Sequence, residues 1–167
     1  MNTSLTSLFL LTLGLSACGG GGGGGGGGGP FVAANQLGTW SGTWNNTTFS
    51  STGPVTMTVT QAGDTYTIAF DMGGNVFGGA DPALESFTAT VSATGATLTP
   101  TTSAVYGDLT GSLGGGGTLT ISGQNITGAV DRFAFTGTWS ATQVTGNVTI
   151  TFDDTSTAAG TATLTKV

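Results

Sequence analysis

The side chains that most often carry out chemistry in proteins are scarce in this chain. Its 167 residues include no histidine, one cysteine, two basic residues and eight acidic ones. Without histidine the chain lacks the usual general base near neutral pH and the commonest metal ligand, so a Ser-His-Asp triad cannot be assembled. Lys166 is the single lysine, and no serine precedes it in an S-x-x-K pattern. We therefore expect a protein that is not an enzyme, with no catalytic residues, no metal site and no cofactor.

A pair of carboxylates is the one catalytic arrangement that this composition allows, because two carboxylates suffice for glycoside hydrolysis. Most of the acidic residues stand beside glycine or proline at expected turns, where an Asp side chain accepts hydrogen bonds from nearby backbone amides. The acidic residues are Asp64, Asp71, Asp81, Glu85, Asp108, Asp131, Asp153 and Asp154. We interpret them as turn residues rather than as a catalytic pair.

The lone cysteine has neighbours that indicate one specific reaction. Cys18 follows Leu15-Ser16-Ala17, at the end of an apolar stretch that starts at Leu5. That stretch has the length of an export signal and is too short for a transmembrane helix. The four residues resemble the lipobox of bacterial lipoproteins, whose cysteine thiol receives a diacylglycerol. The resemblance implies that residues 1–17 are a lipoprotein signal peptide and that Cys18 is lipidated; a free thiol is the alternative.

A glycine run separates Cys18 from the rest of the chain. It extends from Gly19 to Gly29 and ends at Pro30. Glycine loses the most backbone entropy on ordering, so residues 18–36 are expected to form the lipidated cysteine and a flexible linker. As a coil the run would span about 17–20 Å. We expect a membrane partner through the lipid anchor and a location in the cell envelope; Gly19 after the cysteine favours the outer membrane if the host is Gram-negative.

The remaining residues, 37–167, show the period-two alternation that is typical of β-strands. Threonine occupies many of the alternate positions, and this β-branched residue gives a strand a polar but uncharged face. The apolar sets are Val55/Met57/Val59, Tyr66/Ile68/Phe70, Phe87/Ala89/Val91, Leu119/Ile121, Phe133/Phe135/Trp139 and Val148/Ile150/Phe152. About eight to ten strands with short connections predict an all-β fold, a single antiparallel up-and-down β-barrel, with a two-layer β-sandwich as the alternative.

Glycines and one irregular segment interrupt this alternation. Gly95, Gly107, Gly111, Gly123 and Gly146 are interpreted as turn or bulge positions. The longest irregular segment is 73–83. We weigh two interpretations of it, a lid across the mouth of a barrel and a plain surface loop, and favour the loop.

The expected first strand contains two G-x-W units, Gly38-Thr39-Trp40 and Gly42-Thr43-Trp44. Their spacing places Trp40 and Trp44 on one strand face. This pattern resembles the lipocalin-like (calycin) barrels, in which the G-x-W tryptophan closes one end and a cation from the last strand stacks over it. In the expected last strand, 161–167, Lys166 shares a face with Leu164. The resemblance therefore implies that Trp40 and Lys166 close the barrel; a solvated Lys166 is the alternative.

The aromatic residues lead to two hypotheses about function. In the first, the anchored barrel binds a small apolar ligand, with Trp40, Trp44, Phe70, Phe135 and Trp139 as candidate ligand-binding residues. In the second, the protein is a non-catalytic structural or interaction protein of the cell envelope with a filled barrel. Most residues predicted to face inward are large, which favours a filled interior. Inhibition of a secreted protease is a third hypothesis without a distinctive residue behind it.

Charge excludes one class of partner. The net charge is −6, and the two basic residues, Arg132 and Lys166, are far apart in the sequence. Nucleic-acid binding needs clustered lysine and arginine to displace counterions. We therefore expect no nucleic-acid partner, and the sequence leaves the oligomeric state open.

Overall fold

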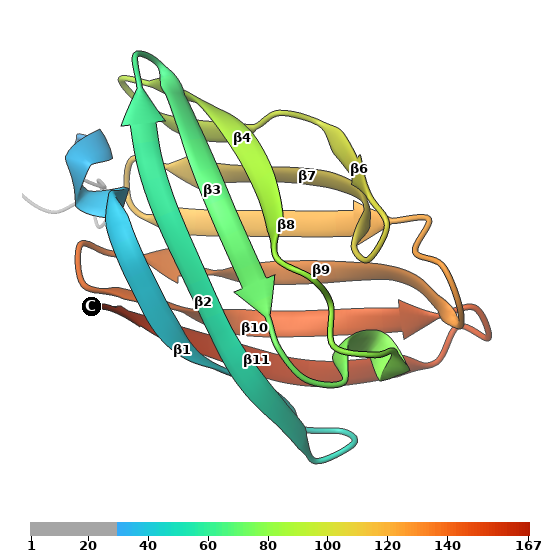
Figure 1. Ribbon diagram of the computed structural model, residues 1–167. Coiled ribbons are helices and arrows are strands. Elements are labelled where there is room, and N and C mark those ends of the chain that lie inside the picture. The colour runs from blue at the N-terminus through green and yellow to red at the C-terminus, as the bar shows by residue number, and fades with distance from the viewer. Residues whose placement is uncertain (1–29) are drawn as a thin grey trace, which may run out of the picture.

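The chain folds into a closed antiparallel β-barrel (Figure 1). The computed structural model describes residues 30–167. The predicted signal peptide, the lipidation site Cys18 and the glycine run lie outside the described residues. Within the described residues ten strands form the ring, because β5 (Gly95–Leu98) pairs with β7 (Gly107–Gly114) and β11 (Thr157–Lys166) returns to β1 (Gly38–Asn46). The prediction of an all-β fold with an antiparallel barrel is confirmed, and closure of the ring rules out the two-layer sandwich.

Eleven strands lie within residues 30–167: ten follow one another around the ring in chain order, and β6 (Thr101–Ser103) pairs with β7 outside the ring. They are β1 (Gly38–Asn46), β2 (Ser51–Ala62), β3 (Thr65–Met72), β4 (Glu85–Ser92), β5 (Gly95–Leu98), β6 (Thr101–Ser103), β7 (Gly107–Gly114), β8 (Thr118–Gln124), β9 (Val130–Trp139), β10 (Gln143–Phe152) and β11 (Thr157–Lys166). Two short 3-10 helices, η1 (Ala33–Gln36) and η2 (Val76–Gly78), complete the elements. The last strand begins at Thr157 rather than at the predicted Thr161. Within residues 30–167, no helix has the length and apolarity that a membrane span requires.

The alternation of the sequence separates an apolar interior from a hydroxyl-rich exterior. In β2 the side chains of Val55, Met57 and Val59 are buried, and the threonines between them point outward. The outer hydroxyls continue from strand to strand, since Thr163 lies opposite both Thr43 and Thr145 in the ladder. One apolar and one wet face per strand is the arrangement expected for an antiparallel sheet wrapped around a single core.

The N-terminal helix η1 closes one end of the barrel, the end at which the C-terminus also lies (Figure 1). Phe31, Ala33 and Leu37 pack against the core, and Gln36 is buried. The hydroxyl of Tyr66 donates a hydrogen bond to the carbonyl of Ala33 over 2.6 Å. The linker was predicted to extend to residue 36, but its last residues, 33–36, form η1 and belong to the folded domain. The reason is that apolar side chains directly after Pro30 gain by packing under the barrel.

Three of the five glycines predicted as turn or bulge positions lie inside strands. Gly95 and Gly107 begin strands with positive φ, as a turn position requires, whereas Gly111, Gly123 and Gly146 lie within β7, β8 and β10. The ring of Phe133 occupies the space where a Cβ of Gly123 would stand, and the ring of Phe135 does the same at Gly146. A glycine inside a strand thus marks the close approach of a neighbouring side chain.

Candidate ligand-binding cavity

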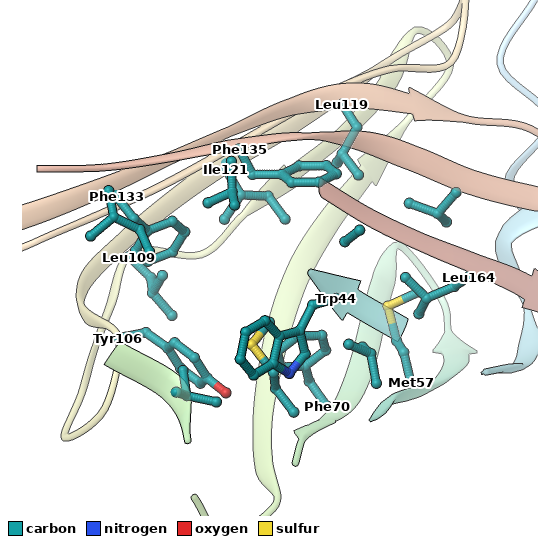
Figure 2. A pocket seen from close by; sticks show the side chains of 18 of the residues that line it. Trp44, Met57, Phe70, Tyr106, Leu109, Leu119, Ile121, Phe133, Phe135 and Leu164 are labelled. Atoms are coloured by element: carbon teal, nitrogen blue, oxygen red, sulfur yellow. The ribbon is translucent and has the colours of Figure 1, made fainter. Parts of the chain in front are cut away.

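The barrel encloses a cavity of about 570 Å³ (Figure 2). Small-molecule sites in proteins typically measure about 300–1,000 Å³. The expectation of a filled interior is therefore wrong. A ring of ten strands is wider than one of eight, which side chains can just fill. Small residues also face inward at Ala89, Ala96 and Gly111, which leaves space beside the large ones.

The cavity wall is almost entirely apolar. Aliphatic and aromatic side chains from all around the ring contribute to it, including Met57, Ile68, Leu109, Ile121 and Leu164. The lining residues, all within 30–167, include no Asp, Glu, Lys or Arg. Such a wall excludes water and stabilises hydrocarbon surface through the hydrophobic effect.

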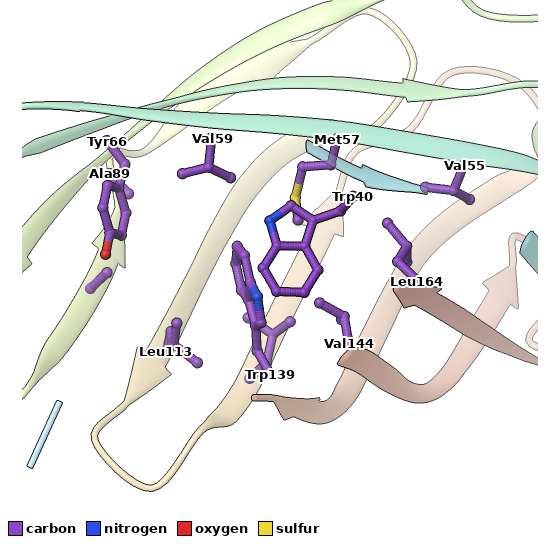
Figure 3. Packing of buried hydrophobic residues seen from close by; sticks show 12 residues of the cluster. Trp40, Val55, Met57, Val59, Tyr66, Ala89, Leu113, Trp139, Val144 and Leu164 are labelled. Carbon is purple, nitrogen blue, oxygen red and sulfur yellow. The ribbon is translucent and has the colours of Figure 1, made fainter. Parts of the chain in front are cut away.

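Trp40 lies beneath the cavity floor at the end that η1 covers, and its ring packs against that of Trp139 (Figure 3). Its side chain is fully buried, its indole N–H donates to the carbonyl of Gln36 over 3.0 Å, and its ring meets that of Trp139 edge to face at 5.5 Å. The Nζ atom of Lys166 lies 5.3 Å from the centroid of the Trp40 ring and donates to the carbonyl of Asn35 over 3.1 Å. Trp40 and Lys166 thus meet, as the resemblance to lipocalin-like barrels implies.

The five predicted ligand-binding residues divide into two groups. Trp44, Phe70, Phe135 and Trp139 line the cavity, whereas Trp40 does not and packs beneath Trp139. Trp40 and Trp44 share a strand face, as predicted, but they serve opposite ends of the interior. The sequence pattern could not separate them, because it records which face a residue occupies and not its height in the barrel.

The segment 73–83 packs over the other end of the barrel and is not a plain surface loop. Val76 in η2 is buried, and Phe77 lines the cavity. Phe77 has a φ of 52°, a left-handed conformation that is unfavourable for a bulky residue. Contacts of its ring with Tyr106 and Phe133 offset this strain. Hydrogen bonds hold the segment: the indole N–H of Trp44 donates to the carbonyl of Gly73, the amide of Gly73 donates to the carbonyl of Pro54, and the amide of Gly74 donates to Asp81.

The cavity reaches the surface beside this segment. Its lining there includes Phe49 in the turn between β1 and β2, Asn46 at the end of β1, and Phe152 at the end of β10. Phe49 is 60 % exposed and packs edge to face against Phe152. This end is therefore the mouth, and the segment 73–83 covers part of it as a lid would.

Tyr106 is the central aromatic residue of the mouth, and the sequence analysis missed it. Its ring packs edge to face with four phenyl rings at centroid distances of 5.9 to 6.4 Å, those of Phe70, Phe77, Phe87 and Phe133. Tyr106 stands in the connection between β6 and β7, where no alternation marks a residue as inward. The available signal was a lone aromatic in the turn Ser103-Ala104-Val105-Tyr106-Gly107.

Hydrogen bonds from a buried serine fix the position of Tyr106. The Ser103 hydroxyl accepts from the backbone amides of Val105 and Tyr106 and donates to the carboxylate of Glu85 over 2.8 Å. Burial raises the pKa of the Tyr106 hydroxyl far above its usual value, and the negative charges of Glu85 and Asp71 raise this pKa further. The Tyr106 hydroxyl is therefore neutral at every physiological pH.

Comparisons with known proteins give one informative likeness. No protein-family model matches the chain. No curated protein matches it either. Among solved structures the chain is similar to Rv2717c from M. tuberculosis, with a TM-score of 0.57 and 10 % sequence identity over 80 % of this chain and 94 % of that one. At this level of identity the likeness shows the fold alone, and the fold to which this chain belongs is a closed antiparallel β-barrel.

Proposed function

We propose that this protein is a lipid-anchored binding protein of the cell envelope that holds one small apolar molecule inside its barrel. The observation that carries the proposal is the apolar cavity of about 570 Å³, lined by Trp44, Phe70, Phe135 and Trp139. A preformed apolar space of this kind favours an apolar ligand. The apolar surface of the ligand leaves water on binding, and the protein does not have to open a new cavity to receive it. Our alternative hypothesis, a structural protein with a filled barrel, does not account for this cavity.

The role we propose is binding and not catalysis. Within residues 30–167, the ionisable group that lines the cavity is the Tyr106 hydroxyl, whose raised pKa keeps it protonated and so leaves no base at this position. Covalent or acid–base chemistry requires a nucleophile and a base within reach of each other. The lining supplies shape and apolar surface, and its buried hydroxyl is that of Tyr106.

The anchoring part of the proposal rests on the lipobox-like residues Leu15-Ser16-Ala17-Cys18. The folded domain begins at η1, at the end opposite the mouth (Figure 1). An anchor that enters at the closed end leaves the mouth free to exchange ligand. The location we propose is the membrane of the cell envelope, the outer membrane if the host is Gram-negative.

Two experiments test these parts separately. Native mass spectrometry of the protein purified from its own host should detect a non-covalent adduct, and added lipophiles should change the tryptophan emission. Absence of both effects would remove the binding function. In labelled cells Cys18→Ala should abolish incorporation of palmitate and release the protein from membranes, and a variant that keeps its label would refute lipidation at Cys18.

A further inference from the structure

Among the hydroxyl and amide side chains that line the cavity within residues 30–167, that of Tyr106 is the buried one. The others are exposed or half-buried: Asn45, Asn46, Ser51, Asn75, Ser112 and Thr161. Tyr106 is only 4 % exposed, and within residues 30–167 its hydroxyl has no hydrogen-bond partner. The hydrogen bonds that hold its turn come from the backbone amides of Val105 and Tyr106 and leave the hydroxyl free. Figure 2 shows the hydroxyl oxygen directed towards Trp44 and Phe70, in the cavity. The hydroxyl is not sealed from the cavity in the way that the indole nitrogen of Trp139 is, so a ligand oxygen can pair with it, whereas a pure hydrocarbon that covered it would leave it without a partner.

The other polar groups of the interior are already engaged or out of reach. The indole N–H of Trp44 donates to Gly73 over 2.9 Å, and that of Trp40 donates to Gln36. The indole nitrogen of Trp139 has no partner within residues 30–167, but it is buried below the accessible surface. The hydroxyl of Tyr66 donates its hydrogen bond to the carbonyl of Ala33. Tyr106 is therefore the buried group that can recognise a polar atom.

The charges around the cavity disfavour an anionic ligand. Glu85 begins β4 on the same strand face as the cavity-lining Phe87, and its carboxylate is held by Ser103 beside the Tyr106 turn. Neither basic residue compensates this charge. Lys166 lies under the floor, bound to Asn35, and Arg132 pairs with Asp131 outside at 2.6 Å. A carboxylate on a ligand would be buried without a cation, which costs far more than burial of a neutral group.

Resting on the proposed binding function, we infer that the cavity selects an uncharged, mainly hydrocarbon molecule whose single oxygen hydrogen-bonds to the Tyr106 hydroxyl. An alcohol, ether or ketone fits this description, and a fatty acid does not. The hydroxyl both donates and accepts, so it serves either kind of oxygen.

The test uses the chain from residue 18 with Cys18→Ala, which carries no lipid and needs no detergent. Neutral N-phenylnaphthylamine reports occupancy through its fluorescence in apolar surroundings, and decanol and decanoate compete for the site at neutral pH. We expect decanol to bind at least about tenfold more tightly than decanoate, because the latter is ionised. Tyr106→Phe should weaken decanol about three- to tenfold, the effect of one neutral hydrogen bond.

Two further variants sharpen the result. Tyr66→Phe removes the other tyrosine hydroxyl of the chain, which lies outside the cavity, and should leave the preference for decanol unchanged. Glu85→Gln should raise the affinity for decanoate relative to decanol, because it removes the nearest negative charge. Thermal unfolding confirms that each variant is folded.

The outcomes separate the inference from the proposed function. If neither the fluorescent probe nor decanol binds, the proposed function fails and the inference falls with it. If the probe binds but decanoate competes as well as decanol, the proposed function stands and the selection of neutral ligands is overturned. A decanol affinity that Tyr106→Phe leaves unchanged would overturn the role of the hydroxyl.

Discussion

Trp40 and Trp44 stand four residues apart on one face of β1, and we expect their truncation to have opposite consequences. Trp40 is fully buried, packs on Trp139 and donates a hydrogen bond to Gln36. Replacement of a buried tryptophan by alanine costs about 3–5 kcal/mol. Loss of the edge-to-face contact is part of that cost, worth about 0.5–1.5 kcal/mol. Since domains unfold with about 5–15 kcal/mol, Trp40→Ala should remove about a fifth of the stability or more.

Trp44→Ala should lower the stability of the fold far less than Trp40→Ala, and it should weaken ligand binding more. Trp44 faces the cavity and is only partly buried, so its removal enlarges an existing space and breaks one hydrogen bond to Gly73. We expect a loss of about 1–2 kcal/mol, mainly from that bond and from partial burial. A ligand in the cavity, however, loses the indole as a contact surface, and its affinity should fall.

The assay is urea unfolding followed by far-ultraviolet circular dichroism, which does not depend on the tryptophan removed. The midpoint and the slope together give the free energy of unfolding of each variant. Binding of N-phenylnaphthylamine measures the second property in the folded variants. Equal losses of stability at the two positions, or a larger loss for Trp44→Ala, would refute the assignment of Trp40 to the packing beneath the floor and of Trp44 to the wall.

Three further predictions concern the titration of two tyrosines, packing at two glycines and the cation–π contact of Lys166. Burial raises the pKa values of Tyr66 and Tyr106 in the native state, so the unfolded state loses these protons at lower pH. The free energy of unfolding should therefore keep its full tyrosine contribution below about pH 10 and fall as the pH rises above it. Ultraviolet titration should detect tyrosinate only when the protein unfolds, and ionisation of these tyrosines in the native protein at pH 10 would contradict the prediction. Gly146→Ala should cost about 1–3 kcal/mol by overpacking against Phe135, whereas Gly114→Ala, which meets only one atom at 3.9 Å, should be nearly neutral in urea unfolding. Lys166→Met should cost about 0.5–1 kcal/mol through loss of the cation–π contact, and no coupling with Trp40→Phe in a double-mutant cycle would contradict that contact.

The strands were predictable from the sequence because each one has a single apolar face. The alternation of Val55, Met57 and Val59 with threonine gives the inward face of β2 without any knowledge of its neighbours. The same holds for the placement of Trp40 and Lys166 together, since a first and a last strand must pair when a barrel closes, and Trp40 lies directly opposite Lys166 in the ladder. Period-two patterns record the face of a residue, and the face was predicted correctly.

The cavity was not predictable in the same way, because its volume depends on the number of strands in the closed ring. Counting large inward residues favoured a filled core, but each wall residue reaches only part of the way to the axis of a ten-stranded barrel. The glycines show the same limit. Gly146 was predicted to be a turn or bulge position, yet it lies in the regular part of β10, where it makes room for the ring of Phe135. That ring comes from the neighbouring strand, so the sequence around Gly146 does not reveal it.

Tyr106 reaches the cavity because the sheet is interrupted beside it. The ladder between β4 and β5 ends at Leu98 and the hydrogen bond from Thr99, and Pro100, which has no N–H, follows at once. Strand β6 then continues on β7 alone, so the start of β4 has no backbone partner on that side. The Ser103–Glu85 hydrogen bond bridges this opening, and the turn that follows carries the ring of Tyr106 between the phenyl groups of the mouth. A continuous strand would have placed a residue of the alternating pattern here, and the cavity would then lack the buried hydroxyl that can distinguish a polar ligand atom from hydrocarbon.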